Sequence, residues 1–488
     1  MKQAIIIGAG IGGIASALRL AKKGYAVEVF EANSHPGGKL TQFEQAGYRF
    51  DAGPSLFTMP QFVEDLFDLF GERASDHFDY WKKSTVCHYF WEDGTRFSVD
   101  ADPDVFVREA ASTFSVSPRS LQRYLDRARL KYELTAPIFL ERSLHKLGTY
   151  LNGETLRAFL KIGKMDINRS LDATNRSLLK HPKLIQLFNR YATYNGSSPY
   201  QTPGIMSMIP HLEMEFGTYF PKGGMVSITN ALVALAERQG VEFHYNKPVS
   251  RIIVERNRVK GVRVFKKMHE ADVVVTNMDV FHTYRKLMPD QPAPERTLNS
   301  ERSSSALIFY WGIRGQFPEL DLHNIFFSED YATEFDHLFY RKTLFEDPTV
   351  YVNISSKESS EDAPPGCENW FVMINAPGNY GQDWDRMIDE ARANILDKLE
   401  RNLGKEVRSS IATEAILDPR SIESRTSSYR GALYGAASND KFAAFLRHPN
   451  FHRRIENLYF CGGSVHPGGG IPLCLLSGKI VGDLVGAA

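Results

Sequence analysis

The sequence contains little cysteine and carries no net charge. Its four cysteines, Cys87, Cys367, Cys461 and Cys474, are scattered over 488 residues, which excludes a disulfide framework or a Cys-x-x-Cys metal site and favours a reducing cytoplasm. Its 58 lysine and arginine residues balance 58 aspartate and glutamate residues. Because nucleic-acid binding depends on excess positive charge, we expect no nucleic-acid partner.

Hydrophobic runs without helix-breaking residues are also missing. The uncharged run 3–18 imitates a signal peptide, but four glycines between positions 8 and 13 interrupt it. The uncharged run 458–478 is long enough to cross a bilayer, but it holds two prolines and six glycines, which would leave backbone polar groups unsatisfied in lipid. We therefore expect neither a cleaved leader nor a membrane span, and any membrane contact is expected to be peripheral.

The remaining composition is that of an ordinary globular protein. With 43% hydrophobic and 24% charged residues, it is neither disordered nor fibrous. Its length suggests about two to four domains, and a chain of this size buries about three quarters of its surface on folding. A core can therefore form without disulfides or metals.

The N-terminus carries a dinucleotide-binding pattern. The apolar run 4–7 predicts a buried strand, 11–23 a helix that stops at Gly24, and 26–30 a second strand. Between the first strand and the helix, Gly8, Gly10 and Gly13 match G-x-G-x-x-G, and Glu31 follows the second strand. Glycines at these positions let a pyrophosphate approach the helix N-terminus, and the carboxylate can accept both ribose hydroxyls. The pattern indicates FAD or NAD.

Further pieces of the same α/β architecture recur along the chain. We predict a helix after residues 223–224, strands at 249–254, 259–264, 271–276 and 458–460, and a closing helix from Pro472. Residues 100–220 are mostly helical in pattern, with leucines at 140, 144, 147 and 151 in helical spacing, whereas 300–415 mix strands with a helix near 385–403. One nucleotide-binding domain from three separated pieces, plus a second domain, is the expected organisation.

Three ordered blocks separate FAD from NAD. The sequences at 35–39 (His-Pro-Gly-Gly-Lys), 50–55 (Phe-Asp-Ala-Gly-Pro-Ser) and 457–472 resemble the FAD-dependent amine-oxidase and phytoene-desaturase superfamily over essentially the whole chain. The blocks 466–472 and 209–225 resemble the bacterial carotenoid desaturases. The stretch Gly-Gly-Ser-Val-His-Pro-Gly at 462–468, with Leu-Ser-Gly at 476–478, is closest to the 1-hydroxycarotenoid 3,4-desaturase branch.

The resemblance implies a fold and a division into domains. We expect a Rossmann-like FAD-binding domain formed by 1–70, 221–298 and 416–488. A mixed α+β substrate-binding domain would comprise 71–220 and 299–415, with 105–200 as a helical, membrane-facing subdomain.

The resemblance also implies residues that hold the adenosine and pyrophosphate parts of FAD. Besides the three glycines, Glu31 would bind the ribose, Lys39 the pyrophosphate side, and Val249 the adenine through its backbone, while Asn277 would close the nucleotide pocket. Many relatives carry arginine where this chain has Lys39, so the contact here lacks arginine's bidentate geometry.

At the other end of the cofactor, Ser55 and Leu56 would line the flavin, and Gly463, Gly470 and Ile471 would lie against the pyrophosphate and isoalloxazine. The side chains of Val249 and Ile471 are equally explained as core. No nucleophile, metal cluster or acid–base pair is found, and the catalytic residues are left unassigned.

Several conspicuous residues have simpler explanations. His466 is interpreted as a histidine held by loop backbone, and Cys461 and Cys474 as buried thiols. Glu213, Glu215, His211 and Arg425 are interpreted as structural or surface groups. Part of 135–165, with Lys146, Lys161 and Lys164 nearby, could enter the lipid interface.

The implied activity is removal of two hydrogens from a carotenoid, at C3–C4 of a 1-hydroxycarotenoid. The partners would be this long hydrophobic substrate, the inner face of the cell membrane, and a quinone or oxygen as electron acceptor. A carotenoid cis–trans isomerase with the same FAD fold, and a phytoene- or lycopene-type desaturase of unhydroxylated carotenes, stay open as alternatives. An amine or protoporphyrinogen oxidase and a non-catalytic lipid carrier are further ones.

Overall fold

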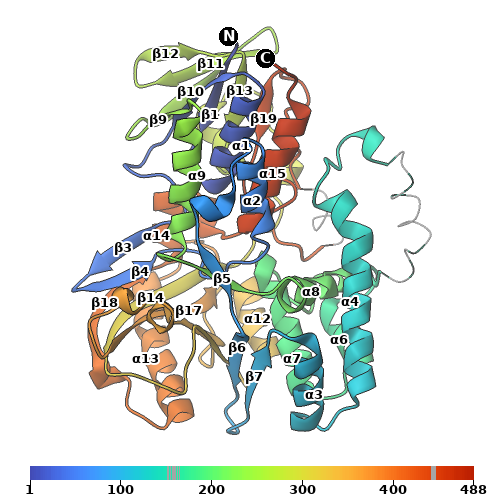
Figure 1. Ribbon diagram of the computed structural model, residues 1–488, viewed down its shortest axis with the longest axis vertical. Helices are drawn as coiled ribbons and strands as arrows, with labels where there is room; N and C mark the ends of the chain where they lie inside the picture. Colours follow the sequence, from blue (N-terminus) through green and yellow to red (C-terminus); the bar gives the residue numbers. More distant parts are fainter. Residues whose placement is uncertain (151–152, 154, 156–160, 162, 164, 441–446) are drawn as a thin grey trace.

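A computed structural model describes residues 1–150, 153, 155, 161, 163, 165–440 and 447–488 (Figure 1). One end of the molecule is built on a five-stranded parallel sheet. Its strand order is β19 (Leu458–Phe460), β13 (Val273–Thr276), β1 (Gln3–Ile7), β2 (Ala26–Phe30) and β9 (Glu242–His244). Three separated stretches of chain therefore meet in one sheet, and the predicted α/β fold class is confirmed.

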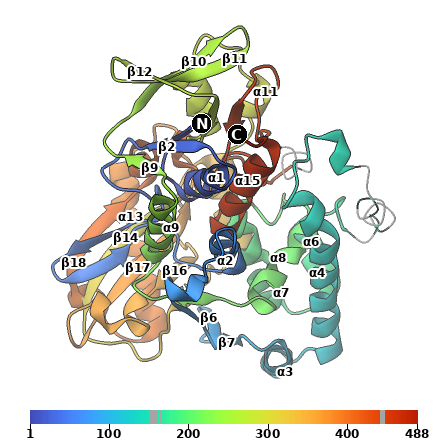
Figure 2. The same ribbon diagram turned by 45° about the horizontal axis from the view of Figure 1, so that its top comes forward.

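Both faces of this sheet are covered, which explains the continuous apolar run of β1. Ala4 and Ile6 face a core that includes α1 (Ile11–Lys22), α2 (Gln61–Asp68), α9 (Val226–Arg238) and α15 (Ile471–Leu484). Ile5 and Ile7 face a core shared with the antiparallel sheet β10 (Val249–Glu255), β11 (Arg258–Val264) and β12 (Lys267–Glu270). Figure 2 shows the helices and the small sheet on opposite sides. A strand buried on both faces loses polar–apolar alternation.

A seven-stranded sheet forms the opposite end of the molecule. Its order is β18 (Ile411–Leu417), β14 (Ser305–Arg314), β17 (Cys367–Ala376), β16 (Val350–Asn353), β15 (His323–Phe326), β6 (Thr85–Phe90) and β7 (Arg96–Asp100). Only the β15–β6 pair is parallel among these neighbours. Helix α13 (Trp384–Leu403) covers one face, and the hairpin β3 (Gln42–Gln45) and β4 (Tyr48–Asp51) packs against the other.

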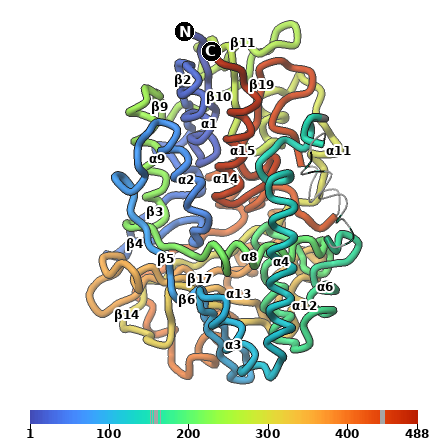
Figure 3. The backbone as a smooth tube through the Cα atoms, turned by 45° about the vertical axis from the view of Figure 1, so that its right-hand side comes forward, coloured from blue at the N-terminus to red at the C-terminus, as the bar shows by residue number. Residues whose placement is uncertain are grey.

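Helices lie beside this sheet, as predicted for 100–220. They are α3 (Pro103–Thr113), α4 (Pro118–Phe139), α6 (Leu171–Leu178), α7 (Pro182–Asn189) and α8 (Ile209–Met214), together with α12 (Tyr331–Asp336) from a later part of the chain (Figure 3). The shorter elements are β5 (Tyr80–Lys82), which pairs with β8 (Tyr219–Pro221), and α10 (Val280–His282), α11 (Glu295–Leu298) and α14 (Pro419–Thr426).

The prediction of a helix through the leucines at 140–151 is wrong for the residues that the structure describes. Helix α4 ends at Phe139, so that Leu140 is its C-cap and Leu144 lies in the turns beyond, while Leu151 is outside the described residues. The hydroxyls of Thr149 and Tyr150 donate to the carbonyls of Ser143 and Leu144 at 2.6 and 2.7 Å. These side chains satisfy carbonyls that a continued helix would bond internally. Among the described residues, no helix combines the length and apolar character that crossing a bilayer requires.

Candidate functional site

The glycine-rich loop lies between β1 and α1, as the pattern predicts. Gly8 has φ +94° and its N–H donates to the carbonyl of Phe30 at 2.8 Å. A Cβ on Gly13 would lie 2.2 Å from the carbonyl oxygen of Gly8, so only glycine lets α1 pack this closely on the loop. Gly10 is the N-cap of α1 and supplies no side-chain cap, which leaves the first amides of the helix free for an anion.

Glu31 lies at the end of β2 and its carboxylate reaches back to this loop. One oxygen accepts from the backbone N–H of Ala9 at 2.7 Å, and the other accepts from the backbone and side chain of Asn33 at 2.8 and 2.9 Å. Glu31 is 5% exposed. A carboxylate offers about four acceptor sites, so capacity is left for a ribose hydroxyl. The backbone N–H of Lys247, just before Val249, donates to the Glu31 carbonyl at 2.8 Å.

Asn277 joins all three pieces of the parallel sheet. Its backbone N–H donates to the carbonyl of Ile7 at 2.8 Å, and its side chain fills the space that glycines leave. A Cβ on Gly10 or on Gly462 would approach the Asn277 amide to 2.4 Å. The glycines of both terminal loops therefore pack around one half-buried amide, and any Cβ there would push the loops apart.

Lys39 links the predicted block at 35–39 to the C-terminal part of the chain. The backbone of Gly37 donates to Ala9 at 2.8 Å, which places the block beside the glycine loop. The Lys39 ammonium donates to the carbonyl of Leu433 at 3.0 Å. Burial lowers the pKa of Lys39, and the charge of Asp279 opposes that shift. Lys39 is half-buried, and its ammonium also donates to the carbonyl of Ala432 at 3.4 Å, which leaves one of three N–H donors for an anionic group.

Ser55 and Leu56 belong to a segment that crosses the seven-stranded sheet. The hydroxyl of Ser55 bonds the hydroxyl of Tyr351 at 2.9 Å, and Tyr310 donates to the carbonyl of Ala52 at 2.9 Å. Leu56 is half-buried. The segment predicted to line the flavin thus lies against the seven-stranded sheet.

The C-terminal glycine loop leads into α15. Gly470 is its N-cap, has φ +102° and supplies no side-chain cap, and a Cβ built there meets nothing within 4 Å. Gly463 packs closely against Gly469, because a Cβ on Gly463 would lie 3.2 Å from the Cα of Gly469. Ile471 is 6% exposed in the core of the helices, so its side chain is core, as is most of Val249.

His466 and the two C-terminal cysteines lie in surroundings that agree with their interpretation as structural groups. Nε2 of His466 bonds the carbonyl of Arg142 at 2.8 Å, and burial lowers the pKa of His466 to about 4. Cys461 and Cys474 are free thiols, with pKa values that burial raises to about 12 and about 11. Thiols that stay protonated are poor nucleophiles.

The residues present fit a dinucleotide cofactor. Two helices of 12 and 14 residues, α1 and α15, begin at uncapped glycines, and Glu31 supplies the acceptor that a ribose requires. Lys39 supplies a cation between the terminal loops. The roles of the individual residues stay predictions, because their positions agree with binding but do not demonstrate it.

The sequence did not predict two buried polar side chains on the seven-stranded sheet. His323 and Asn353 are 3% and 5% exposed and lie beside Tyr351. It did not predict a role for Arg190 either, although Arg190 pairs with the buried Glu213 at 3.2 Å. For His323 and Asn353 the available signal was a polar residue inside an apolar strand. Arg190 begins a 3-10 helix, and its partner Glu213 is 23 positions away.

With this geometry in place, the class of protein is defined. Residues 11–485 match the family of flavin containing amine oxidoreductases, and the chain belongs to that family. Membership confirms the predicted flavin cofactor, FAD, and the prediction of an oxidoreductase.

Particular relatives match along the whole length. The chain is 59% identical over 485 residues to a 1-hydroxycarotenoid 3,4-desaturase of Flavobacterium sp. (strain P99-3), covering 99% of both chains. It is 33% identical over 493 residues to a 4,4'-diaponeurosporene oxygenase of Staphylococcus aureus (strain MSSA476), covering 100% of this chain and 98% of that one. The suspected family resemblance is thereby confirmed.

Solved structures confirm the fold alone. An oxidoreductase from Methanosarcina mazei superposes with a TM-score of 0.62 at 17% identity, covering 99% of this chain and 100% of the other. A putrescine oxidase bound to putrescine superposes with a TM-score of 0.63 at 15% identity, covering 99% and 97%.

Proposed function

We propose that this protein is an FAD-dependent carotenoid desaturase that removes two hydrogens from C3–C4 of a 1-hydroxycarotenoid. The observation that carries the proposal is the 59% identity to the Flavobacterium desaturase over 99% of both chains. The predicted function agrees with it. The 33% identical oxygenases act on the same broad class of polyene, so the reaction type is the property to test.

We further propose the division of labour between the parts of the chain. Residues 1–70, 221–298 and 416–488 would hold FAD, and 71–220 with 299–415 would hold the substrate. In support, all five strands of the parallel sheet fall in the first group, and six of the seven strands of the other sheet fall in the second. The seventh, β18 (Ile411–Leu417), ends two residues beyond the boundary at 415.

When bound, FAD supplies a two-electron acceptor for a hydride from an allylic carbon. Glu31, Lys39 and the terminal glycines would bind its adenosine and pyrophosphate, and Ser55 and Leu56 would orient its ring. The polyene delocalises the developing positive charge, so the protein's contribution is mainly to position the bond and to exclude water.

We propose that such a chain lies on the face of the seven-stranded sheet opposite α13, along the half-buried part of an apolar row. The hairpin β3–β4 covers this row at Ile308, and the helical part covers it at Ile325 and Tyr89. Residues directly opposite one another in successive strands share a face. Across six strands, one such row is Leu417, Ile308, Met373, Tyr351, Ile325 and Tyr89. At about 4.8 Å between strands the row is about 24 Å long, comparable with a long polyene. The segment holding Ser55 crosses this row at Tyr351.

Peripheral membrane contact is part of the proposal, at the cytoplasmic face. Residues 140–150 lie beyond the end of α4 at the side of the molecule (Figure 1), and Tyr150 is 38% exposed. Lys164, one of the three lysines predicted to lie near the lipid interface, is outside the described residues. Deleting 140–165 should lower liposome co-flotation; undiminished flotation would contradict the membrane contact. A quinone or oxygen would reoxidise the flavin.

The reaction is tested by expressing the gene in a strain that makes hydroxylated carotenes and analysing the pigments. A product lighter by two hydrogens, with absorption shifted to longer wavelength, is expected. An unchanged mass would indicate the isomerase, added oxygen atoms an oxygenase, and conversion of unhydroxylated carotenes alone a phytoene- or lycopene-type desaturase. A Glu31→Gln variant with depleted FAD is the control.

A further inference from the structure

A chain of hydrogen-bonded polar side chains lies on the face of the seven-stranded sheet that is proposed to hold the substrate. Tyr351 is half-buried in β16 and its hydroxyl bonds Ser55 at 2.9 Å on one side and Nδ1 of His323 at 2.8 Å on the other. The side-chain amide of Asn353 lies 3.2 Å from the same nitrogen and donates to the carbonyl of Leu322 at 3.0 Å. Ser55, Tyr351, His323 and Asn353 are called the hydroxyl relay below.

The hydroxyls of the relay are not bound to one direction. Nδ1 of the neutral His323 ring accepts from the Tyr351 hydroxyl in one tautomer and donates to it in the other, and either hydroxyl of the Ser55–Tyr351 pair can be the donor. A hydroxyl group has one donor and two acceptor sites. The half-buried end of the relay can therefore bind a ligand hydroxyl, which is itself both donor and acceptor.

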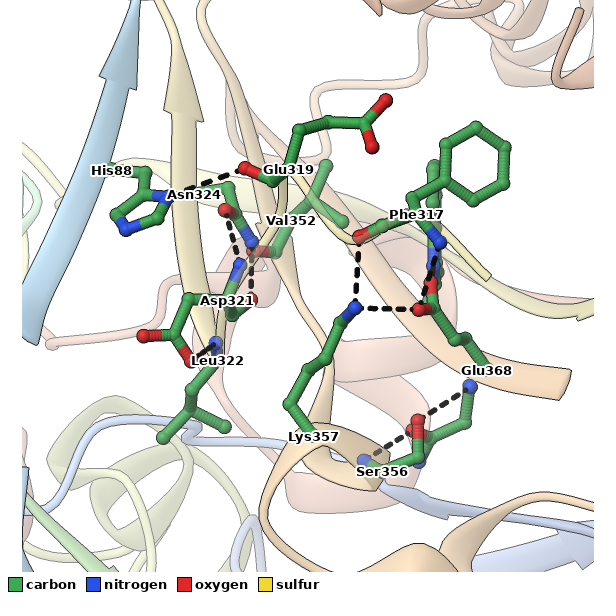
Figure 4. Close-up of polar contacts among 12 residues, drawn as sticks. His88, Phe317, Glu319, Asp321, Leu322, Asn324, Val352, Ser356, Lys357 and Glu368 are labelled. Carbon is green, nitrogen blue, oxygen red and sulfur yellow. Dashed lines mark hydrogen bonds and ion pairs between the residues drawn. The ribbon is translucent and has the colours of Figure 1, made fainter. Parts of the chain in front are cut away.

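The inner end of the relay is fixed and uncharged. His323 is 3% exposed and burial lowers its pKa to about 3, so the ring stays neutral. The turn before it is held by Asn324, which donates to the carbonyls of Asp321 and Val352 at 2.6 and 3.2 Å and accepts from the Asp321 N–H at 3.0 Å (Figure 4). A neutral group held in one place suits a neutral alcohol rather than an ammonium or a carboxylate ion.

The position of the relay agrees with the chemistry of the substrate. The hydroxyl of a 1-hydroxycarotenoid is three bonds from C3, at most about 4 Å away, so its partner must lie close to the reacting bond. Ser55 belongs to the segment proposed to line the flavin, and Tyr351 lies in the apolar row where that segment crosses it.

A second buried polar cluster is farther away. The hydroxyls of Tyr89 and Tyr194 have no hydrogen-bond partner among the described residues. The rings of both tyrosines lie against Arg190, whose guanidinium is 5.5 and 5.4 Å from the ring centroids. Tyr89 is two strands from Tyr351 in the same row, about 10 Å. That distance is too long for the 1-hydroxyl when C3–C4 lies near Ser55.

We propose that Tyr351, oriented by His323 and assisted by Ser55, forms a hydrogen bond with the substrate's 1-hydroxyl and makes the enzyme prefer hydroxylated carotenes. This inference rests on the proposed function. It makes Tyr351 a specificity-determining residue with no part in bond breaking, so its loss should change substrate choice more than maximal rate.

The test supplies a 1-hydroxylated carotene and its unhydroxylated parent together and measures the ratio of the two dehydrogenated products by mass. Wild-type protein should favour the hydroxylated substrate, and Tyr351→Phe should lower the ratio about tenfold, the usual effect of one hydrogen bond. Tyr124→Phe is the matched control, because its buried hydroxyl bonds Asn175 in the helical part at 2.9 Å; its ratio should be unchanged. FAD content verifies folding.

The outcomes separate the inference from the proposed function. Three results would overturn the role of the relay and leave the proposed desaturase activity in place. They are an unchanged product ratio in Tyr351→Phe, no preference for the hydroxylated carotene in the wild type, or a loss of that preference in Tyr89→Phe instead. A wild type that dehydrogenates neither carotene would overturn the proposed function, and the relay with it. Ser55→Ala should show a smaller fall in the same direction.

Discussion

Gly13→Ala tests the packing that shapes the cofactor loop. Alanine in place of glycine in a helix stabilises it by about 1 kcal/mol, so a substitution without steric consequence would raise stability. Here the new Cβ would lie 2.2 Å from the Gly8 carbonyl oxygen, whereas ordinary contact begins near 3.4 Å. The two must separate by about 1.2 Å (3.4 − 2.2), and both are backbone-anchored, so the strain cannot be relieved by a rotamer change.

Overpacking of this kind costs about 1–3 kcal/mol, which outweighs the gain in helix propensity. We expect a lower thermal midpoint and at least tenfold weaker FAD binding, about 1.4 kcal/mol, because the loop that must approach the pyrophosphate is displaced. Gly486→Ala is the control, since nothing lies within 4 Å of its Cβ. Flavin absorbance per protein and FAD titration are the measurements. Stoichiometric flavin and an unchanged midpoint in Gly13→Ala would refute the packing argument.

Three other predictions concern single charged groups. Glu31→Gln should weaken FAD binding by about tenfold or more, since hydrogen bonds to a charged group contribute about 1.5–3 kcal/mol; an unchanged dissociation constant would count against the ribose role. Lys39→Met should also lower FAD affinity, measured by the same titration, whereas an effect on stability alone would assign Lys39 to the Leu433 contact. Burial raises the pKa of Glu334 to about 7 from 4.5, so its favourable contribution is present below pH 4.5 and is lost as pH rises through 7. Glu334→Gln should therefore gain up to about 3 kcal/mol over wild type between pH 5 and 8 in denaturant unfolding, and parallel pH profiles would disprove this.

The N-terminal unit was predictable because its signals are local. A strand, three spaced glycines, a helix and Glu31 occupy adjacent positions, and each has a conformational reason that does not depend on remote residues. The pairing of β10 with β11 was predictable for the same reason, since the two strands follow one another directly.

The hydroxyl relay was not predictable from the sequence. Ser55 and Tyr351 are 296 positions apart, and His323 meets Tyr351 and Asn353 only through the register of β15 on β16. A one-residue change of register would turn these side chains to the opposite face. The end of α4 was missed because spacing alone cannot show that Thr149 and Tyr150 bond the carbonyls of the turn.

The most direct test of the central claim is a single-turnover reaction without oxygen or added quinone. Purified flavin-bound protein is mixed with excess 1-hydroxycarotenoid, and the extracted product is quantified by mass. The account predicts up to one equivalent of product per bound flavin, lighter by two hydrogens, and further product when quinone or oxygen is added. Many equivalents of product with unchanged mass, or no product with either acceptor, would contradict it.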